Sequence, residues 1–74
     1  MTLKTGDFVV YGPDPRINGF PLDNREIGQV RSIYVGERGV TYAKVSYPHR
    51  PSESGSPMLK SWPEDMLTVI ERQS

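Results

Sequence analysis

The sequence predicts an all-β fold, a single small barrel of five short strands. Apolar residues gather in short clusters rich in Val, Ile and Tyr, and the apolar spacing of an amphipathic helix is nearly absent. Gly, Pro, Asn and Ser separate these clusters, and seven Gly and seven Pro among 74 residues favour frequent turns. A chain of this length forms one domain, residues 1–74, with an ordered core expected at about 6–71.

The first predicted strand covers residues 7–11, and a long loop covers 12–26. Prolines directly after the strand cannot donate hydrogen bonds to a sheet, so the strand is expected to end there. Fifteen residues without regular structure are unusual in so small a domain, and such loops are often functional. Phe20 and Leu22 interrupt the polarity of the loop, and we expect both to pack back onto the barrel.

The second and third strands are predicted at 28–35 and 40–47, joined by a tight turn at 36–39. The turn has Gly at both ends, which is typical of a hairpin. The apolar positions of the second strand slip by one residue near Ser32, which predicts a β-bulge there. Tyr34 and a tyrosine of the third strand flank the turn, so the two rings are expected to face each other.

The last elements follow a loop expected at 48–57, whose composition is that of a mobile linker. A short strand is predicted at 58–62. A proline then opens a single 3₁₀ turn at 63–66, since too few residues remain for a longer helix. The closing strand is expected at 67–71.

This order of elements resembles an SH3-like small β-barrel of the KOW or Tudor type. The resemblance rests on four short segments: Gly6 to Val10 (GDFVV), Glu26 to Val30 (EIGQV), Ala43 to Tyr47 (AKVSY) and Glu64 to Ile70 (EDMLTVI). It implies a five-stranded SH3-like barrel and a binding module that contacts its ligands with aromatic side chains beside the loops. The first loop is longer than is usual in such modules.

The composition excludes several classes of protein and function. Nine basic residues balance nine acidic ones, and no Cys is present to form a disulfide, a thiolate metal site or a thiol nucleophile. No run of apolar residues is long enough for a signal peptide or a membrane span, so a cytoplasmic protein without membrane contact is expected. The single histidine, His49, has no fixed partner for acid–base catalysis. We therefore expect no catalytic residues, no metal and no cofactor.

The main hypothesis is a non-enzymatic, regulatory or accessory protein that binds a protein partner. Aromatic residues and arginines dominate the energetics of protein interfaces, and several lie at strand ends or in the two long loops. The candidate partner-binding residues are Tyr11, Arg16, Phe20, Tyr47, Arg50 and Trp62. The alternative for any one of these rings is that it only fills the core of a small barrel.

A second hypothesis is a nucleic-acid-binding module associated with transcription or translation. Basic residues of the predicted hairpin, interleaved with an aromatic ring, would form a salt-sensitive groove for nucleic acid. The candidates are Arg31, Arg38, Tyr42 and Lys44. A third possibility, an enzyme, requires an oligomer that builds its site at a shared axis. The sequence is compatible with a monomer or a small homo-oligomer.

Overall fold

The computed structural model describes residues 3–51 and 53–72, and its five strands form one antiparallel sheet. The order across the sheet is β4-β3-β2-β1-β5. The strands are β1 (Phe8–Tyr11), β2 (Gly28–Val35), β3 (Thr41–Pro51), β4 (Pro57–Pro63) and β5 (Leu67–Glu71). The predicted all-β class is therefore confirmed.

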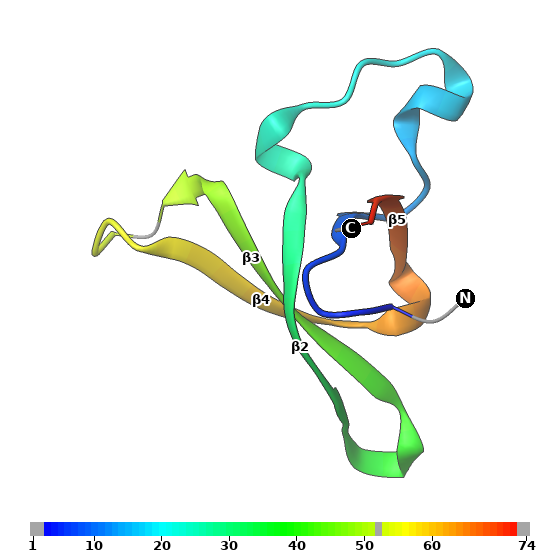
Figure 1. The fold of residues 1–74 in the computed structure, drawn as a ribbon, viewed down its shortest axis with the longest axis vertical. Helices are drawn as coiled ribbons and strands as arrows, with labels where there is room; N and C mark the ends of the chain where they lie inside the picture. The colour runs from blue at the N-terminus through cyan, green and yellow to red at the C-terminus, as the bar shows by residue number, and fades with distance from the viewer. Residues whose placement is uncertain (1–2, 52, 73–74) are drawn as a thin grey trace.

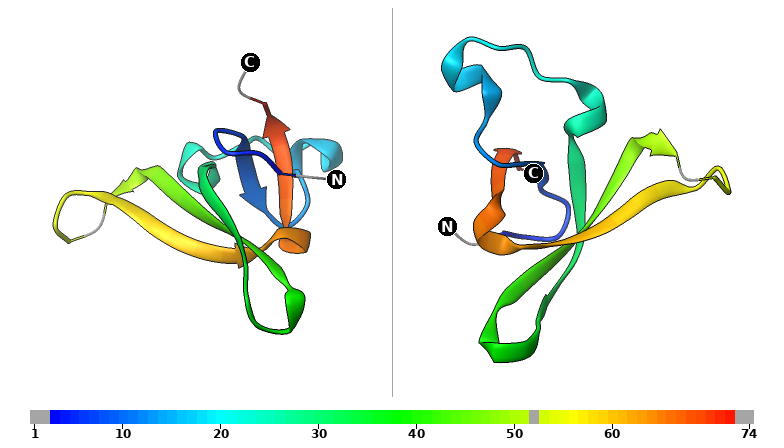
Figure 2. Two further views of the ribbon diagram at one scale, coloured as in Figure 1. Left: turned by 60° about the horizontal axis from the view of Figure 1, so that its bottom comes forward. Right: turned by 180° about the vertical axis from the view of Figure 1, so that it is seen from behind.

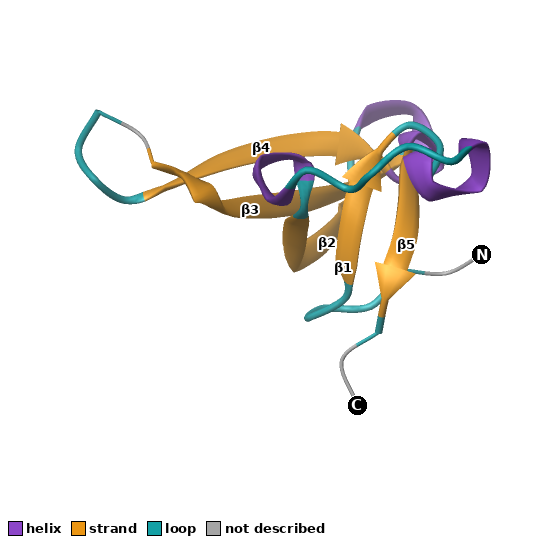
Figure 3. Ribbon diagram, turned by 90° about the horizontal axis from the view of Figure 1, so that it is seen from above, coloured by secondary structure: helices purple, strands orange, loops and turns teal. Residues whose placement is uncertain are grey.

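The predicted closure into a barrel is not observed, because the two edge strands, β4 and β5, do not pair with each other. A closed barrel needs every strand to tilt and stagger so that the first and last strands meet. Here β1 and β5 run across the direction of β3 and β4 (Figure 3), and the chain passes from β4 to β5 through the short 3₁₀ helix η4 (Glu64–Met66). The result is a strongly bent, open sheet.

The two hairpins extend away from the centre of the molecule in different directions, with the long loop as a third projection (Figure 1). The β3–β4 hairpin is longer than predicted, because β3 continues to Pro51 and β4 begins at Pro57. Half of the linker expected at 48–57 is thus sheet, and Pro51 lies opposite Pro57 after a register shift. Proline is tolerated there because the pairing is irregular and near the hairpin end.

The β2–β3 hairpin agrees with the sequence in its main features. The register shifts between Val30 and Ser32, so the predicted bulge is confirmed. Tyr34 lies opposite Tyr42, and their rings stack with centroids 5.6 Å apart. The connection is a short 3₁₀ turn, η3 (Glu37–Gly39).

β1 and β5 lie side by side across the other three strands (Figure 2), and the core cluster draws its strand residues from β1, β2 and β3. Val9 of β1, Val30 of β2 and Val45 of β3 are completely buried. Leu3 also belongs to this cluster, although it precedes the first strand. Partly buried side chains surround the core, namely Met58, Trp62, Leu67 and Val69.

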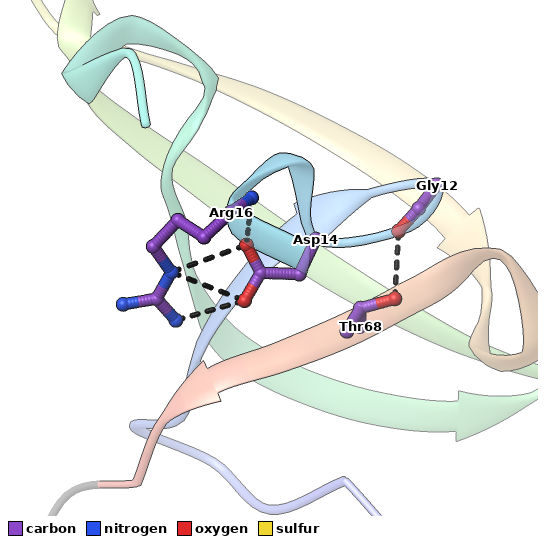
Figure 4. A network of polar contacts seen from close by, with 4 residues as sticks. All are labelled: Gly12, Asp14, Arg16 and Thr68. Atoms are coloured by element: carbon purple, nitrogen blue, oxygen red, sulfur yellow. Dashed lines mark hydrogen bonds and ion pairs between the residues drawn. The ribbon is translucent and has the colours of Figure 1, made fainter. Parts of the chain in front are cut away.

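The loop at 12–26 is more ordered than predicted, since it contains two 3₁₀ helices, η1 (Pro15–Asn18) and η2 (Asn24–Glu26). An aspartate precedes each helix and accepts a hydrogen bond from a backbone N–H of its first turn. The start of the loop is tied to β5 by Thr68 Oγ1, which donates to the carbonyl of Gly12 at 2.6 Å (Figure 4). Local side-chain bonds therefore shape a segment that has almost no helical propensity.

Candidate binding surfaces

Three of the predicted partner-binding aromatic residues meet at one pocket. Tyr11 comes from the end of β1, Tyr47 from β3 and Trp62 from the end of β4. The pocket has a volume of about 190 Å³ and is lined by Tyr11, Glu26, Tyr47, Arg50, Met58, Lys60 and Trp62. We call it the aromatic pocket. The predicted residue Arg50 also belongs to it.

The three rings of the aromatic pocket contact one another, and these contacts fix their positions. Trp62 Nε1 donates a hydrogen bond to the Tyr47 hydroxyl at 2.8 Å, and the Tyr11 ring packs on Trp62 with centroids 4.3 Å apart. Tyr47 is buried, and this burial raises the pKa of its hydroxyl. Tyr11, by contrast, is 51% exposed. The cluster thus has a buried base and an exposed ring at its mouth.

Charged groups surround these rings. Arg50 forms an ion pair with Glu26 of η2, and its Nε donates to the carbonyl of Arg25 at 2.9 Å. The Lys60 ammonium lies 5.5 Å from the centroid of the Trp62 ring, within the range of a cation–π contact. Arg50 thereby joins β3 to the end of the long loop, while Lys60 keeps a charge above the tryptophan.

A second pocket, of about 280 Å³, lies against the long loop and shares Tyr11 and Glu26 with the aromatic pocket. Its remaining lining residues are Val10, Pro13, Pro15, Pro21, Leu22 and Asp23. The two pockets therefore adjoin at Tyr11 and Glu26. We call this second space the loop pocket.

Two predicted partner-binding residues lie outside the aromatic pocket. Arg16 binds Asp14 through both its Nε and its Nη2, with distances of 2.8–3.1 Å (Figure 4). These side-chain bonds lower the pKa of Asp14. Phe20 is 65% exposed, so the expectation that it packs back onto the sheet is wrong. Leu22 is half-buried and lines the loop pocket together with Val10 and Tyr11 of β1.

Three of the four residues of the nucleic-acid hypothesis lie on the side of the sheet opposite to the aromatic pocket. Arg31 and Lys44 line a depression of about 330 Å³, together with Ser46, Ser56, Pro57 and Leu59. Tyr42 is half-buried on the same side, beside Tyr34. Arg38 lies apart, exposed in the turn η3 with a positive φ of 61°.

Sequence reasoning missed several residues of these surfaces. Lys60 and Met58 reach the aromatic pocket because they lie two and four positions before Trp62, and alternate residues of a strand share a face. That spacing was a usable signal. Glu26 gave no such signal, since only the folded path of the long loop carries it to Arg50.

The described part of the chain contains no group of three or more His, Asp or Glu placed to hold a metal ion. His49 is exposed and lines a separate pocket of about 220 Å³ with apolar neighbours that include Phe8, Ile27 and Ile70. Residues 3–51 and 53–72 include no helix long and apolar enough to cross a membrane. No protein-family model matches the chain, and searches of curated proteins and of solved structures found no significant match.

Proposed function

We propose that this protein is a non-enzymatic binding module that holds an extended segment of a protein partner across the aromatic pocket and the loop pocket. The observation that carries the proposal is the meeting of Tyr11, Tyr47 and Trp62 from three different strands at one pocket. Tyr11 remains half exposed at the mouth of this pocket, and exposed apolar surface rimmed by polar groups is typical of an interaction site.

The two adjoining pockets suit an extended peptide. Side chains two positions apart in an extended chain point the same way, so successive alternate residues can enter the two pockets on either side of Tyr11. Apolar or aromatic residues would fill both spaces, since aromatic rings, prolines and aliphatic side chains together make up most of the lining residues. Tyr and Trp give large contact areas for little loss of side-chain entropy.

The charges around the aromatic pocket would select among such segments. Arg50 is already paired with Glu26, whereas Lys60 forms none of the ion pairs among the described residues. A carboxylate of the partner placed near Lys60 would therefore gain an ion pair without breaking one in this chain. We infer that the preferred segment combines an apolar residue with a nearby acidic one.

The test is selection from a phage-displayed random-peptide library with the folded protein as bait. Trp62 is the only tryptophan, so its fluorescence reports directly on the pocket when a selected peptide is titrated. Binding to wild type with a change in Trp62 emission is expected. Tyr11→Ala should weaken that binding at least about tenfold, because it removes one pocket wall.

Tyr11→Phe is the matched control, since it keeps the ring and should retain most of the affinity. Circular dichroism and thermal unfolding establish that both variants remain folded. If the library yields no peptide that alters Trp62 emission, the proposal fails. If Tyr11→Ala and Trp62→Ala both unfold the chain, the rings serve the core, and the proposal fails as well.

A further inference from the structure

The outward side of β2, β3 and β4 carries a second surface, distinct from the two pockets of the proposed function. Alternation along β3 places Ala43, Val45 and Tyr47 in the core, so Tyr42, Lys44 and Ser46 face the other way. Arg31, at the bulge of β2, and Leu59 of β4 border the same depression as Lys44. We call the residues that line this depression the basic face; they are Arg31, Lys44, Ser46, Ser56, Pro57 and Leu59.

The cations of the basic face are available for an outside partner. The ion pairs among the described residues involve four other arginines, each held by its own carboxylate, and neither Arg31 nor Lys44. None of the described residues that line the depression is acidic. Residues 28–63 contain five basic and two acidic residues, although the whole chain is neutral. The segment that contains these three strands therefore carries a net positive charge, of which Arg31 and Lys44 border the depression.

A stacked pair of rings continues the basic face toward the hairpin tip. Tyr34 lies opposite Tyr42, and Ser32 lies opposite Lys44, so the ring pair and Lys44 are one step apart on the same side of the sheet. That step is about 7 Å along a strand. Tyr42 is enclosed between Tyr34 and Gly36, whereas Tyr34 is 43% exposed. Tyr34 is thus the ring available for stacking.

We propose that the basic face binds single-stranded nucleic acid, with Arg31 and Lys44 contacting phosphates and Tyr34 stacking on a base. Charge complementarity favours a polyanion, because the depression is bordered by two cations outside the ion pairs of residues 3–51 and 53–72, and its described lining includes no acidic group. The neighbouring exposed ring favours unpaired bases, since duplex bases stack on each other and leave no face for a side chain. Tyr42, which was a candidate nucleic-acid contact in the sequence, instead supports the Tyr34 ring by stacking on it.

The experiment measures fluorescence anisotropy of labelled single-stranded oligo-dT and oligo-U, and of a labelled DNA duplex, at several salt concentrations. Arg31→Glu/Lys44→Glu should weaken binding of the single strands at least about tenfold at low salt. Removal of two phosphate contacts should also flatten the slope of log K against log salt by about 1.4. Tyr34→Leu should cost about 5- to 100-fold, and Tyr34→Phe should retain binding.

Lys4→Glu is the matched control for charge, because Lys4 is an exposed cation outside the basic face and outside the ion pairs. It should leave affinity within about twofold of wild type. The proposal is overturned if the single strands do not bind at low salt or if Lys4→Glu weakens binding as much as the double variant. Equal affinity for the duplex, or equal competition by polyglutamate, would overturn the single-strand assignment.

Discussion

The two sides of β3 differ in chemistry although they belong to one strand. The inner side presents Val45, buried completely, and Tyr47, whose hydroxyl accepts from Trp62 at the floor of the aromatic pocket. The outer side presents Lys44, which is exposed, lies outside the ion pairs of the described residues and borders a depression whose described lining is free of acidic groups. Because successive side chains of a strand point to opposite faces of the sheet, neighbouring residues of β3 belong to a packed aromatic cluster on one face and to a solvated cationic surface on the other.

This difference teaches that the two proposed binding functions can be altered independently. Substitutions on the inner side act on the core as well as on the aromatic pocket, so their effects on binding and on stability are coupled. Substitutions on the outer side change a surface that the core does not need. Four predictions sharpen this contrast, beginning with the largest expected effect.

Gly28→Ala tests how tightly the inner side is packed. A Cβ at this position would lie 2.2 Å from Val45 Cγ1 and 2.9 Å from the Tyr47 ring. Neither neighbour can move freely, because both are buried. We expect a loss of about 1–3 kcal/mol in the free energy of unfolding, measured by urea denaturation. A variant as stable as wild type would show that the inner side is not close-packed there.

Tyr47→Phe tests the hydrogen bond at the floor of the aromatic pocket. It leaves the Trp62 N–H without its partner, which should cost about 0.5–1.5 kcal/mol in the free energy of unfolding. Burial raises the pKa of the Tyr47 hydroxyl above its usual 10.0. Its contribution to stability is therefore full below pH 10 and is lost as the pH rises through the folded-state pKa. The phenylalanine variant should lack this alkaline loss in urea titrations, and an unchanged loss would contradict the assignment.

Gly36→Ala is the outer-side counterpart of Gly28→Ala. Its Cβ would meet the Tyr42 ring at 2.6 Å, a distance that requires a shift, although it is longer than the 2.2 Å at Gly28. The ring stacks on Tyr34, which is half exposed, so both rings can shift outward. A net cost below about 1 kcal/mol is expected by the same denaturation assay, since alanine also restricts the unfolded chain. A cost equal to that of Gly28→Ala would erase the proposed difference between the two sides.

Asp14→Asn tests the long loop, whose residues line the loop pocket. We expect this substitution to lower the stability of the fold only above acidic pH. Hydrogen bonds from Arg16 lower the pKa of Asp14 below its usual 3.8. The carboxylate therefore stabilises the fold above pH 3.8, and this contribution is lost as the pH falls through the lowered pKa. Wild type should be more stable than the variant at neutral pH, and the two should converge in strong acid. A constant difference across that range in thermal unfolding would contradict this origin.

The strands and the hairpin could be predicted because their signals are local. The bulge near Ser32 follows from a slip in the apolar alternation, and the Tyr34–Tyr42 pair follows from the turn between them. The extension of β3 to Pro51 could not be predicted, because prolines and serines favour a linker when no partner strand is known. Pairing with β4 overrides that local preference.

The candidate site was predictable in its residue types but not in its geometry. Tyr11, Tyr47 and Trp62 stood out as aromatic residues at strand ends, whereas Phe20 stood out equally and is exposed on the long loop. The distance of Phe20 from the aromatic pocket depends on the path of the chain through η1, where Asp14 caps the helix and binds Arg16. These hydrogen bonds join neighbouring residues, but the direction that the chain takes after them could not be predicted from the composition of the loop.

Because alternation and turn chemistry act between neighbouring residues, the all-β class and the succession of five strands along the chain could be predicted from the sequence alone. Tertiary packing alone keeps the sheet open and brings Tyr11, Tyr47 and Trp62 together at one pocket. It also decided that Arg50 pairs with Glu26 while Lys44 stays outside the described ion pairs. These features depend on distances between remote segments, which the bend of the sheet and the path of the long loop fix together.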